Sequence, residues 1–201
     1  NDWELVIVND GSKDHTAELV RNMCVAEPHI RLIQHDVNKG YGEALRSGLS
    51  NAKLDWIFIT DSDMQFFIED IETLIPLTQT STFVQGYRIK RRDHAFRVIL
   101  GKVYKVIVHT LFKVPVSDPE CSFRLFKRHF IDNMEIICNG PLVSIELIMR
   151  ANKLGAVFSE VGVRHRLREQ GEANALTFKS LIMVLKDFFT LFIDTHLIRK
   201  S

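Results

Sequence analysis

Short apolar runs alternate with segments of helical spacing through the first half of the sequence. Between the runs, residues 14–26 and 41–52 carry apolar side chains three or four positions apart, which is the period of an amphipathic helix. The runs are rich in β-branched and aromatic residues and are typical of buried strands: Leu5–Val8, Ile30–Ile33, Trp56–Ile59 and Thr82–Val84. Strand and helix in turn predict an α/β fold with a mostly parallel sheet flanked by helices. Ligands of such sheets bind beyond the carboxyl ends of the strands.

The second half is less regular, but it shows no domain boundary. Helical spacing is present over residues 94–112 and 141–154, and strand-like runs cover residues 122–126 and 157–163. No repeat, low-complexity tract or linker rich in Pro, Gly or Ser separates the halves, and 201 residues suit one core. We therefore expect one domain over residues 1–171, followed by an amphipathic helical region over residues 172–201.

Charge is divided unevenly along the chain. Residues 1–85 hold 6 Lys and Arg against 14 Asp and Glu, whereas residues 86–201 hold 20 against 11, for a net charge of +1. The division is compatible with an acidic metal site beside a basic phosphate-binding surface, and equally with two solvated faces that attract each other. The near-neutral total argues against a nucleic-acid-binding protein.

The cysteines and the first residues of the sequence indicate which cellular compartment the protein suits. Cys24, Cys121 and Cys138 are widely spaced and form no C-x-x-C pair, so they predict neither a disulfide framework nor a structural zinc site. A reducing compartment fits this pattern. No basic and then apolar signal segment opens the chain.

The most informative segment is Thr60-Asp61-Ser62-Asp63-Met64-Gln65, which follows an apolar run directly. Two carboxylates two positions apart on a turn can face one hard cation, and Mg²⁺ or Mn²⁺ accepts one or two carboxylates together with substrate phosphates. The amide oxygen of Gln65 can add a further ligand. The alternative is that Asp63 caps the helix expected near Ile68.

Polar turns also follow the first and second runs. The first turn, residues 8–16, places Asp10 at the carboxyl edge of the sheet. The second, residues 38–45, contains Gly40 and Gly42, which let the backbone approach a ligand at a helix start that favours negative charge. The dinucleotide fingerprint G-x-G-x-x-G is not met, and the phosphate loop G-x-x-x-x-G-K-[ST] is absent.

Three motifs in this order, V-N-D-G-S-x-D-x-T, N-x-G-x-G-x-A-x-x-x-G and T-D-S-D-x-Q, carry a family resemblance. They resemble the large inverting GT-A glycosyltransferase family (family 2 type), in particular its branch of dolichyl- and polyprenyl-phosphate mannosyl- and glucosyltransferases. The likeness continues through residues 86–88. Residues 118–126 are similar to the family segment D-x-x-C-G-F-R-L-F, with Ser122 where glycine is usual.

The resemblance covers roughly residues 4–171 and implies a GT-A-like nucleotide-binding fold. The family opens with a strand of the type V-x-I-P-x-Y-N-E, which contributes to the nucleotide site, and this sequence begins after it. We therefore expect a GT-A domain whose first strand is missing.

The resemblance also implies roles for individual residues. Asp118 and Arg124 would be catalytic; Asp10, Gly40 and Asp61 would bind the nucleotide; Arg88, Arg97, Arg166 and Arg168 would meet donor or acceptor phosphates; and Asp61, Asp63 and Gln65 would hold Mg²⁺ or Mn²⁺. Arg124 is expected to face a phosphate too. Asp118 can instead orient Arg124 or touch the metal, and residues 88–97 can be a solvated basic loop.

The implied reaction is transfer of a hexose from a nucleotide-diphosphate sugar to a polyprenyl or dolichyl phosphate, with inversion, at the cytoplasmic face of a membrane. A phosphate monoester with a second pKa near 6 is largely ionised at neutral pH, so it needs no strong base. Catalysis then rests on positioning and charge neutralisation. Three alternatives stay open: a same-fold enzyme acting on a saccharide or protein, a nucleotidyltransferase, and a non-catalytic remnant.

Residues 181–198 are apolar enough to raise the question of a membrane span. Lys186, Asp187 and Asp194 lie inside this stretch, and each costs about 2.5–3.5 kcal/mol at the bilayer centre. We expect an amphipathic helix that packs on the domain or lies in the membrane interface. The basic residues 164–168 would then meet a membrane surface.

Overall fold

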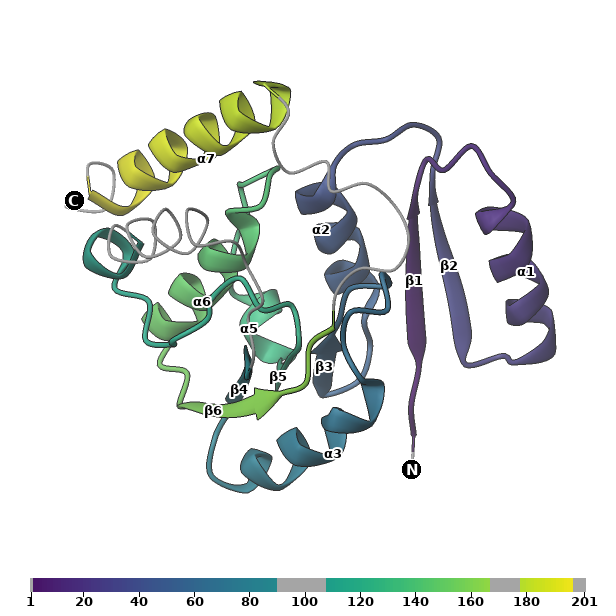
Figure 1. Ribbon diagram of the computed structural model, residues 1–201, viewed down its shortest axis with the longest axis horizontal. Coiled ribbons are helices and arrows are strands. Elements are labelled where there is room, and N and C mark those ends of the chain that lie inside the picture. The colour runs from purple at the N-terminus through teal and green to yellow at the C-terminus, as the bar shows by residue number, and fades with distance from the viewer. Residues whose placement is uncertain (1, 90–107, 167–177, 197–201) are drawn as a thin grey trace.

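The computed structural model describes residues 2–89, 108–166 and 178–196. Figure 1 labels its helices and strands. The first part contains β1 (Leu5–Asp10), α1 (Thr16–Ala26), β2 (Ile30–His35), α2 (Tyr41–Asn51), β3 (Trp56–Ile59), α3 (Ile71–Leu74) between the 3₁₀ turns Ile68–Asp70 and Ile75–Gln79, and β4 (Phe83–Arg88). The later part contains β5 (Arg124–Lys127), α5 (His129–Asp132), α6 (Val143–Lys153), β6 (Phe158–Val163) and α7 (Phe178–His196).

The strands of the described residues form two groups. β1 and β2 pair in parallel, with Leu5 opposite Ile30 and Asp10 opposite His35. The other group has the order β3-β5-β4-β6, in which β5 is antiparallel to both of its neighbours and β4 is parallel to β6. Three of these four strands therefore run in one direction. The predicted α/β fold with a mostly parallel sheet is confirmed, and β5 is its reversed strand.

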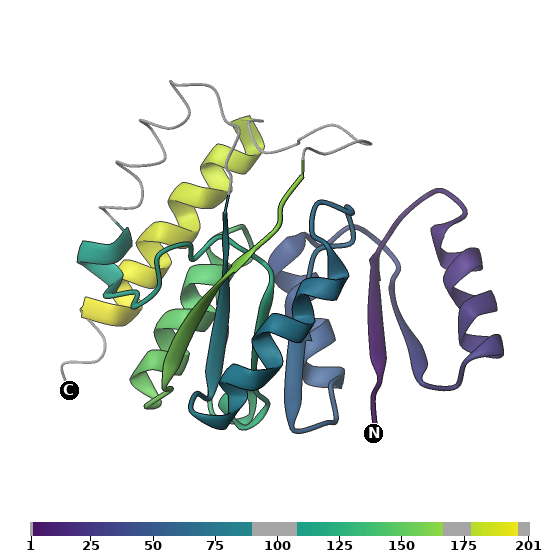
Figure 2. The ribbon, with the colours of Figure 1, turned by 60° about the horizontal axis from the view of Figure 1, so that its bottom comes forward.

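Helices cover both faces of the four-stranded sheet (Figure 2). Successive residues of a strand point to opposite faces, and the buried residues follow this rule. Phe83 and Phe126 belong to a core shared with α2, α6 and α7, whereas their neighbours Val84 and Leu125 belong to a second core that includes Leu74 of α3. Buried apolar side chains on both faces explain why these runs carry so few polar residues.

α6 lies at the centre of the larger core, and nine of its eleven residues are buried. Its buried ionic residues are paired: Arg150 donates a hydrogen bond of 2.7 Å from Nε to the Glu146 carboxylate. The expected helix over residues 94–112 is seen over residues 108–112, and its remainder lies outside the described residues.

The carboxyl-terminal stretch is a long helix, α7, as the spacing predicts. Leu191 is fully buried in the larger core, and Phe188 and Phe192 pack against it. No helix in the described ranges is long and apolar enough to cross a membrane.

Candidate active site

The turn that carries Asp61 and Asp63 begins where β3 ends. Asp63 accepts a hydrogen bond of 3.1 Å from the backbone N–H of Gln65, and Met64 between them has a φ of 60°. This local bond folds the acidic segment into a tight turn. The 3₁₀ turn at Ile68 is capped by Phe67 without a side-chain bond, so the alternative that Asp63 caps this helix is wrong.

Asp61 is held by a hydroxyl from the segment before the neighbouring strand, β5. Ser122 precedes β5, the strand paired with β3, and its Oγ donates a hydrogen bond of 2.6 Å to Asp61. Ser122 is buried, whereas Asp61 is exposed. The pKa of the Tyr41 phenol is raised by burial and then by the charge of Asp61, which indicates that the start of α2 lies close to this carboxylate.

The basic segment at residues 164–166 lies against the acidic turn. The N–H of Arg166 donates to the carbonyl of Gln65 at 2.9 Å, and the side-chain amide of Gln65 donates back to the carbonyl of Arg166 at 3.1 Å. Nε of Arg166 donates to the carbonyl of Met64 at 2.5 Å. Phe66 and His165 form an isolated antiparallel bridge. Residues about 100 positions apart in the sequence thus bring a guanidinium against the turn that carries the two aspartates.

A divalent cation fits the donor set of this turn. In the part of the chain that the structure describes, no group of three or more His, Cys, Asp and Glu side chains is arranged to hold a metal ion. The turn offers two carboxylates and the amide oxygen of Gln65, with Asp61 open to solvent. Mg²⁺ and Mn²⁺ sites of this kind are completed by substrate phosphates and water.

Asp10 fastens the end of β1 to the glycine turn before α2. Its two carboxylate oxygens accept hydrogen bonds of 2.8 Å from the N–H groups of Lys39 and Gly40. Its Oδ1 also lies 2.7 Å from Nδ1 of the buried His35, whose Nε2 lies 2.9 Å from the hydroxyl of Ser47. Burial alone would raise the pKa of Asp10, but these bonds outweigh it and lower the pKa.

Gly40 is needed at this turn because its φ is 94°, a conformation that side-chain-bearing residues rarely adopt. The predicted nucleotide residues Asp10 and Gly40 are therefore in direct contact. A nucleoside contact by Asp10 stays a prediction, since its carboxylate is engaged in holding this turn.

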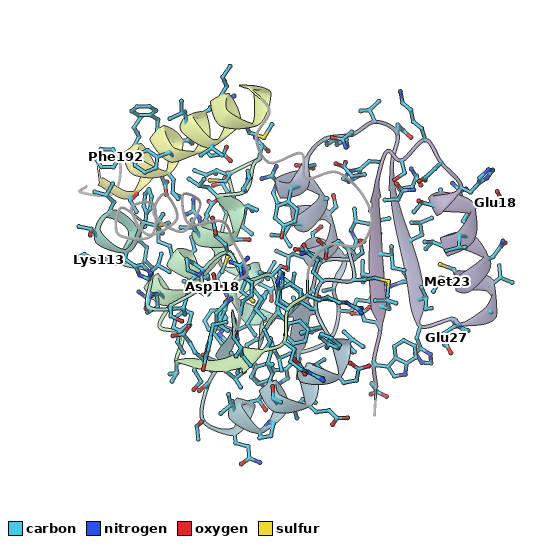
Figure 3. The ribbon with its side chains drawn as sticks, viewed as in Figure 1. Glu18, Met23, Glu27, Lys113, Asp118 and Phe192 are labelled. Atoms are coloured by element: carbon cyan, nitrogen blue, oxygen red, sulfur yellow. The ribbon has the colours of Figure 1, made fainter. Side chains whose placement is uncertain are left out.

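Asp118 is enclosed and bonded to Arg88. Nε and Nη2 of Arg88 each donate a hydrogen bond of 2.7 Å to a different carboxylate oxygen of Asp118. Burial would lower the pKa of Arg88, but its bonds to Asp118 raise it. Figure 3 shows Asp118 in the interior of the molecule, far from the α1 side. The charge of Asp118 also acts on Arg124, so the alternatives for Asp118 stay predictions, while Arg88 is its bonded partner.

Arg124 is a buried structural cation. Arg124 is 1% exposed. Its guanidinium donates hydrogen bonds to the backbone carbonyls of Ser144, Pro119 and Cys121. Burial lowers its pKa. The side chain thus joins the segment before β5 to the start of α6, and a phosphate contact by Arg124 stays a prediction. The sequence pattern does not distinguish an arginine inside the fold from one on its surface.

The other arginines that were predicted to bind phosphates also differ in their surroundings. Arg88 is committed to Asp118, whereas Arg166 keeps its place beside the acidic turn. Arg97 and Arg168 lie outside the described residues. Sequence reasoning missed Ser122, His35 and Tyr41 as partners of the predicted carboxylates, and only Ser122 gave a signal, because it replaces the usual glycine of its segment.

Comparison with known proteins gives one family and one fold. Residues 1–134 match the family described as Glycosyl transferase family 2. A dolichyl-phosphate beta-glucosyltransferase of Trichomonas vaginalis is 32% identical over 177 residues, which are 80% of this chain and 53% of that protein. An undecaprenyl-phosphate 4-deoxy-4-formamido-L-arabinose transferase of Salmonella paratyphi B is 30% identical over 197 residues, 97% of this chain and 59% of that protein. The chain thus spans slightly more than half the length of these relatives.

Solved structures of glucosyl-3-phosphoglycerate synthase from Mycobacterium tuberculosis have the same fold. The complex with Mn²⁺, UDP-glucose and phosphoglyceric acid superposes with a TM-score of 0.66 at 19% identity, over 90% of this chain and 66% of that chain. The complex with UDP gives a TM-score of 0.68 at 17% identity, over 95% and 68%. The fold is GT-A-like, and the chain belongs to glycosyltransferase family 2.

Proposed function

We propose that this chain transfers a hexose from a nucleotide-diphosphate sugar to a polyprenyl or dolichyl phosphate, with inversion at the anomeric carbon. The names of the two relatives above, both lipid-phosphate sugar transferases, support this acceptor class. The fold and the paired aspartates support the donor class.

One structural observation supports a lipid phosphate over a sugar hydroxyl as the acceptor. A sugar hydroxyl must lose its proton to a base during attack, whereas a lipid phosphate monoester is already largely ionised at neutral pH. Both carboxylate oxygens of Asp118 accept hydrogen bonds from Arg88. A carboxylate held in this way is poorly placed to take a proton, which supports an acceptor that needs no base.

In the proposed step, an oxygen of the lipid phosphate forms a bond to the anomeric carbon from the face opposite the leaving group. The bond from that carbon to the diphosphate oxygen breaks, and its electron pair leaves with the nucleoside diphosphate. Asp61 and Asp63 would hold Mg²⁺ or Mn²⁺, which neutralises charge on the departing diphosphate. Ser122 orients Asp61, Arg166 offers its guanidinium near the same turn, and the Asp10–Gly40 contact shapes the nucleotide side.

A membrane surface is the proposed second partner, and α7 supports it. Four exposed side chains of α7 are apolar and recur at helical spacing: Ile182, Leu185, Phe189 and Ile193, each 42–61% exposed. We call these four residues the outer stripe. Such a stripe suits a helix lying in the interface of an anionic membrane, whose lipid phosphates the basic residues 164 and 166 would meet. We assign the chain to the cytoplasmic face as a peripheral protein, and the three free cysteines suit a reducing compartment.

The test is a transfer assay with liposomes that contain undecaprenyl or dolichyl phosphate, Mn²⁺ and a panel of radiolabelled nucleotide sugars. We expect a lipid-extractable sugar phosphate with at least one donor, and its loss in Asp63→Asn but not in Asp132→Asn, the same change at an exposed aspartate of α5. A water-soluble glycoside from a saccharide acceptor, without a lipid product, would favour the same-fold alternative. No product of either kind, together with no binding of nucleotide or Mn²⁺, would favour a non-catalytic remnant.

A further inference from the structure

The acidic residues of α7 face the protein, while its outer stripe faces solvent. Asp187 is 4% exposed, although its neighbour Lys186 is exposed. Oδ2 of Asp194 lies 3.2 Å from Nη2 of Arg150 in α6. The two groups form an ion pair, but their geometry does not make a hydrogen bond. These carboxylates, which the sequence presents as obstacles to membrane insertion, are thus used inside the fold.

Asp187 binds the backbone of the segment before α6. Its Oδ2 accepts a hydrogen bond of 2.6 Å from the N–H of Gly140, and its Oδ1 accepts one of 3.2 Å from the N–H of Asn139. The approach is close: a Cβ on Gly140 would lie 2.7 Å from Oδ2 of Asp187 and 2.9 Å from Cγ of Met183. α7 therefore rests directly on residues 139 and 140.

The same segment holds the start of α2. The N–H of Gly42 donates to the carbonyl of Asn139 at 3.0 Å, and a Cβ on Gly42 would lie 2.5 Å from the carbonyl oxygen of Cys138. Arg46, one turn further along α2, donates to the carbonyl of Cys138 at 2.6 Å and to the side chain of Asn139. In Figure 1, α2 and α7 both begin at the top of the view.

A second path from α7 reaches the same segment. Asp194 pairs with Arg150, and Arg150 donates to Glu146 at 2.7 Å. Glu146, which is fully buried, accepts hydrogen bonds of 2.9 Å and 2.8 Å from the N–H groups of Ile137 and Cys138. Both acids of α7 therefore act on residues 137–140.

These contacts reach the glycine turn before α2. Gly42 lies two residues after Gly40, whose N–H donates a hydrogen bond to Asp10. We propose that Asp187 is a positioning residue for nucleoside-diphosphate binding: through residues 138–140 it fixes the start of α2, so that the seating of α7 sets the affinity for the donor. This inference rests on the function proposed above. It makes α7, a membrane-facing element in that proposal, part of the donor site.

Calorimetry of UDP and GDP binding with Mn²⁺ tests the inference. We expect Asp187→Asn to bind the nucleotide about tenfold more weakly, a usual size for coupling between two sites, because the amide presents one acceptor oxygen where the carboxylate presents two. The matched control is Asp132→Asn, which should bind as the parent does. Equal affinity of Asp187→Asn and the parent would overturn the inference and leave the proposed function standing. A parent chain that binds neither nucleotide would contradict the proposed function itself, and the inference with it.

Hydrogen exchange on the parent chain gives a second readout that a merely structural role would not move. Coupling is reciprocal, so UDP or GDP with Mn²⁺ should slow exchange at the amides of Asn139 and Gly140, which donate to Asp187. If Asp187→Asn fails to fold, hydrogen exchange on the parent chain still tests whether Asp187 is coupled to nucleotide binding. Unchanged exchange at both amides on nucleotide saturation would overturn the proposal.

Discussion

Asp118 and Arg88 form an enclosed ion pair, with 7% and 13% of their side chains exposed. Removing one partner of such a pair leaves an uncompensated buried charge, so Asp118→Asn should lower the free energy of unfolding by about 3 kcal/mol. Asp132→Asn, at the exposed pair with Arg128, should change it by less than about 1 kcal/mol. Urea denaturation measures both. Equal denaturation midpoints for Asp118→Asn and the parent would contradict the structural role of Asp118. Asp118 would then again be a candidate for a catalytic base.

Asp10 gives the fold a stabilising term that depends on pH. Its pKa is lowered in the folded chain, so the charged form is favoured there relative to the unfolded chain. The term is fully present above the ordinary aspartate pKa of about 3.9 and is lost as the pH falls through the lower folded value. The difference in unfolding free energy between the parent and Asp10→Asn should therefore be largest near neutral pH and shrink below about pH 4. A difference that is constant from pH 7 to pH 3 would contradict this assignment.

At the residue scale, the sequence predicts chemistry better than it predicts partners. Asp61 and Asp63 are recognisable because two acids directly after an apolar run are costly unless they serve a turn or a ligand. Arg88, Arg124 and Arg166 look alike in the sequence, yet one is paired, one is buried and one borders the acidic turn. Their difference comes in part from contacts with residues 20 to about 100 positions away, which no local pattern contains.

At the element scale, the strands and long helices are predictable because their cores impose a period. Phe83 and Val84 are both apolar since each face of the sheet is covered, and α2 shows its buried Leu49 at helical spacing. The reversed direction of β5 was not predictable, because strand direction depends on the path of the chain before it. The four-residue helix α5 was also missed, since a single turn is too short to show a period.

The outer stripe of α7 carries an element-scale prediction. The parent chain should float with anionic liposomes at low salt, and Leu185→Ser with Phe189→Ser should leave it in the soluble fraction, because the change removes the apolar face that would enter the interface. Thr190→Ser, at an exposed position of the same helix, is the control. Salt should weaken binding, since exposed charges are screened within about 8–10 Å at physiological ionic strength. A parent that stays soluble with anionic liposomes at low salt would contradict membrane binding by α7.

At the scale of the whole molecule, the described strands β1 and β3 each lie at the edge of a sheet. β1 pairs only with β2, and β3 pairs only with β5, among the residues that the structure describes. Unpaired backbone groups on a sheet edge favour association with other strands. The chain should therefore self-associate increasingly as its concentration rises, which sedimentation velocity measures. A chain that stays monomeric at every concentration would contradict this expectation.

The central claim is that Asp61 and Asp63 hold the cation that the donor diphosphate shares. Three distant parts of the chain converge on this turn: Ser122 on Asp61, Arg166 on Gln65, and the start of α2 near Asp61. If the cation bridges carboxylates and diphosphate, metal and nucleotide bind together or not at all.

Calorimetry of nucleoside diphosphate binding, with and without Mn²⁺, tests this claim most directly. We predict Mn²⁺-dependent binding of UDP or GDP by the parent chain, and loss of that binding in the variant that combines Asp61→Ala and Asp63→Ala, with its fold checked by circular dichroism. A folded double variant that binds the nucleotide with Mn²⁺ as tightly as the parent does would contradict the account.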